Sequence, residues 1–136
     1  MFHGQTTIRI HYALTDQMGV VYYGNYAQFF EIGRTEATRL LGFTYKELES
    51  MGVIMPVSHM DIYYKKPIVY DEIITVHTIL RENPSGAKMT FHGEIYNEKG
   101  DLCSRSAITL YFVDVKTKKP IPIPDELAKV LKPYFP

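Results

Sequence analysis

The N-terminal part of the chain alternates between apolar and polar residues. Within segment 5–13, QTTIRIHYA, polar and apolar side chains alternate from residue 7 to residue 12. The apolar set is Ile8, Ile10 and Tyr12, and the polar set is Thr7, Arg9 and His11. A period of two residues is that of a half-buried strand. We therefore expect a first β-strand here, with His11 as a surface histidine on its polar face.

From Gly24 the apolar residues recur at steps of three and four, which is the period of a helix with one apolar face. The stripe consists of Tyr26, Phe29, Phe30, Gly33, Ala37, Leu40 and Leu41. It predicts one long amphipathic helix that ends at Gly42. A second, short helix is predicted from Tyr45, because Thr44 and Glu47 form a capping box.

Four later segments are rich in β-branched and aromatic residues and are separated by turn-forming breaks. The segments are 53–64, 73–81, 87–96 and 102–114, and the breaks are KKP at 65–67, ENPSG at 82–86 and NEKGD at 97–101. The last two breaks predict hairpins. Because Pro56 has no N–H to donate, the strand that contains it is predicted to lie at a sheet edge, where another subunit could pair with it.

Near the end of the chain, Pro122 and Pro124 predict extended backbone followed by a short helix that starts at Pro124. The full order is strand, long helix, short helix, four strands and short helix. This order indicates an α+β fold in which an antiparallel sheet wraps the long helix. With 136 residues, the chain is expected to form a single domain over residues 1–136.

The charge and cysteine content exclude several classes of function. The chain has 15 basic and 15 acidic residues and a pI near 7.0, so no field would gather nucleic acid or an anionic membrane. No apolar run approaches the roughly 20 residues that span a bilayer, and MFHGQTT does not resemble a signal peptide. The lone Cys103 and the lack of zinc-like His and Cys spacing argue against disulfides and metal. We expect a cytoplasmic protein with no metal or redox cofactor.

A dense motif precedes the long helix. Residues 15–36, TDQMGVVYYGNYAQFFEIGRTE, place one acid, a glycine turn and a row of aromatic rings at the predicted helix start. This stretch resembles the signature of hotdog-fold acyl-CoA thioesterases of the 4-hydroxybenzoyl-CoA thioesterase type. The resemblance rests on Asp16, the run Gly19–Tyr23, Asn25–Tyr26, Phe30–Glu31 and Arg34–Glu36. The later YYKKPIVYDE at 63–72 is similar to the family's second-to-third strand connection.

The resemblance covers nearly the whole chain and implies a hotdog fold, in which a five-stranded antiparallel sheet wraps one long central helix. It also implies hydrolysis of acyl-CoA to a free carboxylic acid and CoA, without a cofactor. Family members join edge strands into dimers, often pair again into tetramers, and hold the site between two subunits. A homo-oligomer, either a dimer or a dimer of dimers, is therefore expected.

By resemblance, Asp16 is the catalytic carboxylate, either as nucleophile or as general base toward water. The resemblance also implies that the backbone N–H of Tyr23 polarises the thioester carbonyl. Independently of any family, a helix N-terminus offers unpaired N–H groups and a positive dipole end, which suit an oxygen that gains negative charge. Without the flanking motif, Asp16 would be an ordinary turn residue.

Three further motif residues are candidates for substrate binding. Tyr22 and Tyr26 are either core or interface aromatics or parts of the acyl site, and the sequence gives both interpretations equal weight. Glu31 and Arg34 sit at i,i+3 on the helix, where an ion pair is the plain expectation. In other hotdog thioesterases a helix glutamate is the catalytic acid, so Glu31 is the reserve candidate.

Coenzyme A carries phosphates that need cations. By resemblance, Lys88 and Lys119 are the expected phosphate-binding residues. The chain also departs from the family pattern, because many relatives have an acid where Leu14 stands and some have a histidine at Tyr23. The site therefore has one loop carboxylate rather than two.

Other functions remain as alternatives. A non-catalytic acyl or CoA-binding module could use the same residues, with Asp16 only orienting a ligand. A purely structural interaction domain is a further alternative, since a fold does not determine function. A hotdog dehydratase would need a histidine beside an acid on the helix, and residues 24–41 contain none. The acyl group, and CoA or acyl carrier protein as its donor, stay open.

Overall fold

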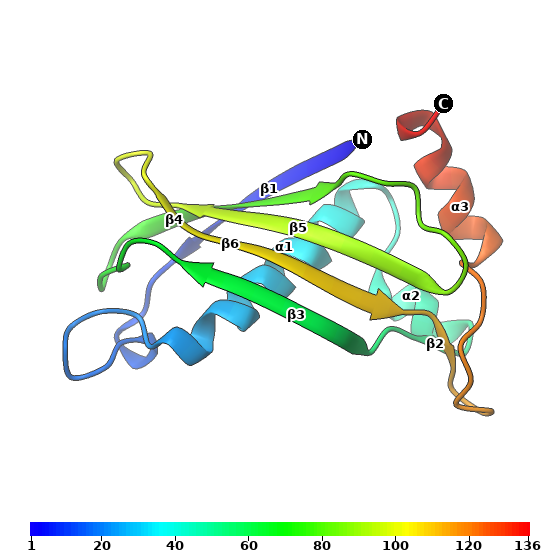
Figure 1. The fold of residues 1–136 in the computed structure, drawn as a ribbon, viewed down its shortest axis with the longest axis horizontal. Helices are drawn as coiled ribbons and strands as arrows, with labels where there is room; N and C mark the ends of the chain where they lie inside the picture. The colour runs from blue at the N-terminus through cyan, green and yellow to red at the C-terminus, as the bar shows by residue number, and fades with distance from the viewer.

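The computed structural model describes all 136 residues, and Figure 1 shows one long helix lying against a sheet. The helices are α1 (Tyr26–Leu40), α2 (Tyr45–Ser50) and α3 (Asp125–Leu131), and the 3-10 turns are η1 (Tyr12–Leu14), η2 (Tyr23–Asn25) and η3 (Lys132–Tyr134). The strands are β1 (Phe2–Arg9), β2 (Val53–Ile54), β3 (Val57–Tyr64), β4 (Ile73–Leu80), β5 (Lys88–Tyr96), β6 (Leu102–Tyr111) and β7 (Val113–Asp114). No helix combines the length and apolar character needed to cross a bilayer.

Five strands form one antiparallel sheet in the order β1-β4-β5-β6-β3, and β2 and β7 form a separate two-stranded sheet. The pairs β4–β5 and β5–β6 are the two predicted hairpins. Helix α1 packs on one face, here called the inner face, and buries Phe29, Phe30 and Ala37 in the core (Figure 1). The predicted α+β architecture, a five-stranded antiparallel sheet around one long helix, is confirmed.

Glycines allow α1 to approach the sheet closely. A Cβ atom on Gly33 would lie 2.7 Å from Val76 Cγ1, and one on Gly93 would lie 2.5 Å from Phe30 Cδ1. Carbon atoms do not pack at these distances without displacement, because interiors are already close-packed. The helix and the sheet therefore meet at positions where one partner has no side chain.

The first strand lies closer to the N-terminus than the alternation predicts. Phe2 pairs with Leu80 and is 6% exposed, so β1 begins there. Tyr12 instead lies in η1 and is 76% exposed, and His11 precedes that turn outside any strand. One apolar residue near the terminus carries no periodic signal, which is why the predicted start was too late.

Two predicted strands are each interrupted. Segment 53–64 divides at Pro56 into β2 and β3, and segment 102–114 divides at Phe112 into β6 and β7. Pro56 donates no ladder bond, although its carbonyl accepts the Tyr111 N–H at 3.1 Å. Pro56 itself lies between the two strands, but the edge position predicted for segment 53–64 is confirmed for β3, which is the last strand of the sheet.

The predicted helix ends agree closely with the structure. Helix α1 stops shortly before Gly42, which has a φ of 87° that glycine adopts at little cost. The Thr44 hydroxyl accepts the Glu47 N–H at 3.1 Å and caps α2, as the capping box predicts. Helix α3 begins at Asp125, so Pro124 is its cap rather than its first residue.

The β3 edge leaves core-facing side chains uncovered. Met60 and Tyr64 pair with Ile108 and Ser104, which are buried residues of the inner face. Cross-strand partners point to the same face of a sheet, so Met60 and Tyr64 also point inward. They are nevertheless 42% and 51% exposed.

Candidate active site

Asp16 lies in a short hairpin that precedes α1. Its N–H donates to the Val20 carbonyl at 2.9 Å, and its carbonyl accepts the N–H of Gly19, which has a φ of 77°, at 3.0 Å. The carboxylate oxygen Oδ1 accepts the Met18 N–H at 2.8 Å, while Oδ2 has no hydrogen-bond partner in the chain. Asp16 therefore has the ordinary role of a turn residue and keeps one carboxylate oxygen free.

The hairpin is fixed to the helix start and to the segment after β3. The Leu14 carbonyl accepts the Tyr22 N–H at 3.0 Å and the Asn25 side-chain amide at 2.9 Å. On the other side, the Val21 N–H donates to the Ile68 carbonyl at 2.8 Å. The two motif stretches, which are far apart in the sequence, are therefore in direct contact.

The start of α1 leaves backbone donors free. Its N-cap residue, Asn25, makes no side-chain capping bond, and its side-chain N–H donates instead to the Leu14 carbonyl. The N–H groups of Tyr23 and Gly24, which lie in η2 just before α1, donate to no backbone carbonyl. Free N–H groups and the positive end of the helix dipole favour a negatively charged oxygen at this position.

A hollow of about 280 Å³ opens beside the helix start. Its walls are Val20, Val21, Tyr23, Tyr26, Tyr64, Lys65, Lys66 and Pro67. Asp16 does not itself line the hollow in the single chain, but Val20, to which its backbone is bonded, does. The hollow thus combines apolar walls, two cations and the free donors of the helix start.

Tyr64, at the end of β3, is a wall residue that sequence reasoning did not single out. Its hydroxyl donates to the Tyr23 carbonyl at 3.2 Å, and its ring lies 6.4 Å from the Tyr23 ring and 4.8 Å from the Tyr26 ring. These contacts tie the end of β3 to Tyr23 and Tyr26 at the start of α1. The sequence signal for Tyr64 is its position in YYKKPIVYDE, the stretch at 63–72 that is similar to the family's strand connection.

Tyr22 and Tyr26 occupy different environments. Tyr26 is 3% exposed, packs 5.9 Å from the Phe29 ring and also forms a wall of the hollow. Burial raises the pKa of the Tyr26 phenol to about 12, with Cys103 and Tyr64 adding smaller repulsion. Tyr22 is 45% exposed and lies outside the hollow, with its ring centroid 4.5 Å from that of Tyr23 and the two rings tilted by 42°.

The raised pKa predicts how stability changes at high pH. Because the folded-state pKa of Tyr26, about 12, exceeds its ordinary value of 10.0, its contribution is intact below pH 10 and lost as pH rises through 12. Urea unfolding of wild type and Tyr26→Phe across this interval measures the effect. We expect the wild type to lose more of its free energy of unfolding than the variant. Equal losses in the two proteins would contradict this assignment.

The predicted ion pair between Glu31 and Arg34 does not form. The ion pairs of the chain are Arg9–Asp71, Glu36–Arg39 and Lys66–Asp101. Arg34 follows Tyr26 and Phe30 at four-residue steps, so it lies on the buried face of α1 and is 4% exposed. Glu31 lies on an exposed face of the same helix.

Lys88 and Lys119 lie at the end of the sheet opposite to the helix start. Lys88 pairs with Tyr111 at the end of β6, and its ammonium sits 5.5 Å from that ring. Lys119 follows β7 at the same end, and Figure 1 shows this end far from the start of α1. The single chain therefore does not bring these lysines to the hollow, whose own cations are Lys65 and Lys66.

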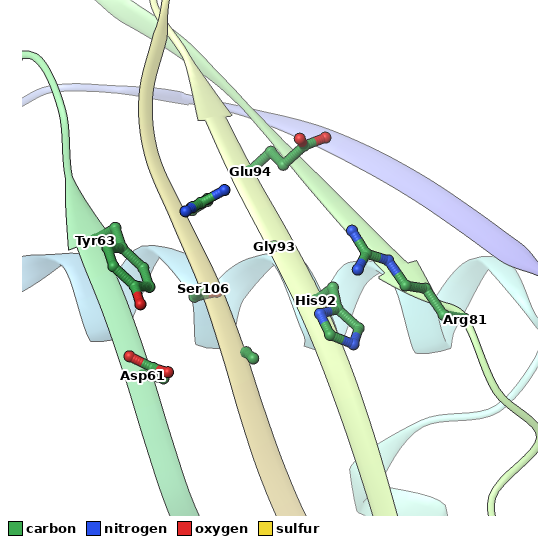
Figure 2. A pocket seen from close by; sticks show the side chains of 9 residues that line it. Asp61, Tyr63, Arg81, His92, Gly93, Glu94 and Ser106 are labelled. Carbon is green, nitrogen blue, oxygen red and sulfur yellow. The ribbon is translucent and has the colours of Figure 1, made fainter.

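A second hollow, of about 220 Å³, lies on the outer face of the sheet, with α1 behind the strands (Figure 2). Its charged lining mixes both signs and includes Asp61, Arg81, Glu94 and Arg105. No predicted site residue lines it, and no group of three His, Cys, Asp or Glu side chains in the chain could hold a metal ion. The hollow at the helix start is the candidate active site, because two predicted site residues, Tyr23 and Tyr26, line it.

Known proteins are similar to this chain in both sequence and fold. Residues 10–131 match the model of the thioesterase-like superfamily. YneP of Bacillus subtilis is 42% identical over 84% of this chain and 82% of its own length, and the acyl-CoA thioester hydrolase YbgC of Escherichia coli is 28% identical over 92% of each. The crystal structure of a DHNA-CoA thioesterase from Staphylococcus aureus is 38% identical, with a TM-score of 0.86 over 100% of this chain and 85% of that one. This chain therefore belongs to the thioesterase-like superfamily, and it is a thioester hydrolase with the hotdog fold.

Proposed function

We propose that this chain hydrolyses acyl-CoA thioesters at the start of α1, with Asp16 as the reacting carboxylate and the Tyr23 N–H as the oxyanion donor. One observation carries the proposal: uncapped N–H groups at the helix start border a hollow whose wall is bonded to the Asp16 hairpin. Acyl transfer needs donors that meet a carbonyl oxygen as it gains charge, and a nearby acid. Both are present within this short segment.

The reaction can follow either of two balanced routes. As a general base, Asp16 takes a proton from water while the water oxygen bonds to the thioester carbon. As a nucleophile, its carboxylate forms a mixed anhydride with the acyl group, which water then hydrolyses. In each route the carbon–sulfur bond breaks, and CoA leaves as a thiolate that takes up a proton. The free Oδ2 of Asp16 suits both routes.

The site is proposed to be completed by a second subunit that pairs along β3. Met60 and Tyr64 face the core layer but are half exposed, and an unpaired edge strand is a template for another chain. Antiparallel pairing of two β3 strands would bring the sheet end that lies opposite to the start of α1 in one subunit toward the start of α1 in the other. That end carries Lys88 and Lys119, which we assign to the CoA phosphates. Such dimers can pair again into tetramers.

The acyl group is proposed to lie along the exposed side of α1. Tyr26 lines the hollow, Tyr22 stands beside it, and Glu31 is exposed one turn further along the helix. One relative is named as an acyl-CoA thioester hydrolase and another as a DHNA-CoA thioesterase, so the proposed substrates include both kinds of thioester. The cytoplasm is the proposed location, in line with a single unpaired cysteine.

A binding module remains the second candidate function, because the Asp16 to Met18 bond is one that a purely structural turn residue also makes. A panel of short-chain, long-chain and aromatic acyl-CoAs, assayed by release of free thiol, separates the two. We expect thiol release from at least one class, with loss of acyl-CoA in equal amount. Saturable binding of acyl-CoA without thiol release would instead establish the binding module.

A further inference from the structure

A small, partly open niche lies between α1 and the inner face of the sheet, two helical turns beyond Tyr26. Its lining includes Phe30, Arg34, Thr78, Gly93 and Ser106. Its free volume is about 10 Å³, which is enough for one particle of the size of a water molecule. The niche shares no residue with the hollow at the helix start.

The niche lies along a row of small side chains in a mostly apolar layer. Thr78, Gly93 and Ser106 are neighbours across β4, β5 and β6. The adjacent rows of the inner face contain Val76 and Ile95 on one side and Phe91 and Ile108 on the other. A Cβ on Gly93 would lie 2.5 Å from Phe30 Cδ1 and 2.7 Å from the Ser106 hydroxyl oxygen, so these two side chains occupy the room that a side chain at position 93 would need.

Arg34 brings an uncompensated charge to this space. It is 4% exposed, and its Nε and Nη1 atoms have no hydrogen-bond partner. None of the ion pairs of the chain includes it. The buried Tyr45 hydroxyl also makes no hydrogen bond. Burial raises the pKa of this phenol and outweighs the opposite effect of the nearby Arg34, so Tyr45 stays neutral and supplies no counter-charge. A guanidinium stays charged at any ordinary pH, and a buried charge without a counter-charge is costly.

We propose that the niche binds one small monovalent anion of the size of chloride, held by Arg34 with the Thr78 and Ser106 hydroxyls. The lining offers a cation and hydroxyl donors but no carboxylate. Sulfate and phosphate are too large for a space that admits one water-sized particle. A water molecule fits by size but leaves the guanidinium charge uncompensated. The anion ties the middle of α1 to the sheet, and this inference does not depend on the proposed hydrolysis.

Crystals of the wild-type protein grown in bromide test the site directly. We expect an anomalous peak in the niche, within about 3.5 Å of Arg34 nitrogen atoms. Density for a water molecule, or a protein carboxylate bonded to Arg34, would overturn the proposal. An anomalous peak without a matching response in solution would show an adventitious ion only, and would overturn it as well.

Thermal unfolding supplies the solution test, with chloride exchanged for the bulky gluconate at constant ionic strength. For wild type we expect the midpoint to rise by about 4 °C at ten times the Kd for chloride. Ser106→Ala keeps the charge but loses one donor, so its half-saturating chloride concentration is expected to rise about fivefold to tenfold. Arg34→Met is expected to abolish the chloride response.

Arg39→Met is the matched control, because it removes an exposed positive charge from the same helix without touching the niche. It should respond to chloride as wild type does. If Arg34→Met does not fold, the half-saturating chloride concentrations of Ser106→Ala and Arg39→Met still test the proposal. Identical midpoints of wild type in chloride and gluconate, or an unchanged half-saturation in Ser106→Ala, would overturn the proposal.

Discussion

Replacing Asp16 by asparagine is expected to lower kcat for acyl-CoA hydrolysis by about 10²–10⁴-fold, the range attributed to a positioned general base. Asparagine cannot take a proton from water or form an anhydride. Its amide oxygen can still accept the Met18 N–H that Asp16 Oδ1 accepts at 2.8 Å. The hairpin should therefore keep its shape, and KM should change little.

Asp114→Asn is a matched control for this substitution. Asp114 is also a turn aspartate, whose Oδ1 accepts the N–H groups of Lys116 and Thr117. It lies in β7, which pairs with β2, and Figure 1 shows β2 far from the start of α1. Thiol release and circular dichroism are measured on both variants. We expect Asp114→Asn to retain wild-type kcat. Normal turnover by Asp16→Asn, with the fold intact, would remove Asp16 from the mechanism.

Replacing Met60 by lysine is expected to separate the subunits and to reduce specific activity by about 10²-fold, since small losses of alignment at a reacting centre have effects of this size. Met60 points to the core layer at the centre of the unpaired β3 edge and is 42% exposed. Lysine on an edge strand blocks pairing with another chain. Light scattering after size-exclusion chromatography gives the oligomeric state.

Ile73→Lys provides the control, because it also puts a lysine at a partly exposed apolar position, in β4 and away from β3. This variant should keep both the wild-type mass and the wild-type activity. A fully active monomer from Met60→Lys would show that one subunit is sufficient. A wild-type protein that is itself a monomer would refute the proposed pairing.

Periodicity and turn chemistry predict the elements well where the signal spans several residues. The apolar stripe of α1, the capping by Thr44 and the edge position after Pro56 all follow from local rules. Element bounds are less predictable when one residue decides them. Phe2 starts β1 and Phe112 ends β6 through tertiary contacts that have no local signature.

The candidate site is less accessible to sequence reasoning, because it depends on what the fold brings together. Tyr64 meets Tyr23 only through the pairing of distant segments. The i,i+3 spacing of Glu31 and Arg34 predicts an ion pair, but the four-residue spacing of Arg34 from Phe30 places it on the buried face, where the pair does not form. Lys88 lies far from the helix start because of the direction in which β5 runs through the sheet, and the sequence alone does not specify this direction.

The most direct test of the account is a crystal structure of Asp16→Asn with an intact aliphatic or aromatic acyl-CoA. We expect two chains paired along β3, and the thioester carbonyl oxygen about 2.7–3.1 Å from the Tyr23 N–H nitrogen, with the side chain at position 16 beside the carbonyl carbon. The thioester bound elsewhere, such as in the hollow on the outer face of the sheet, would contradict the account.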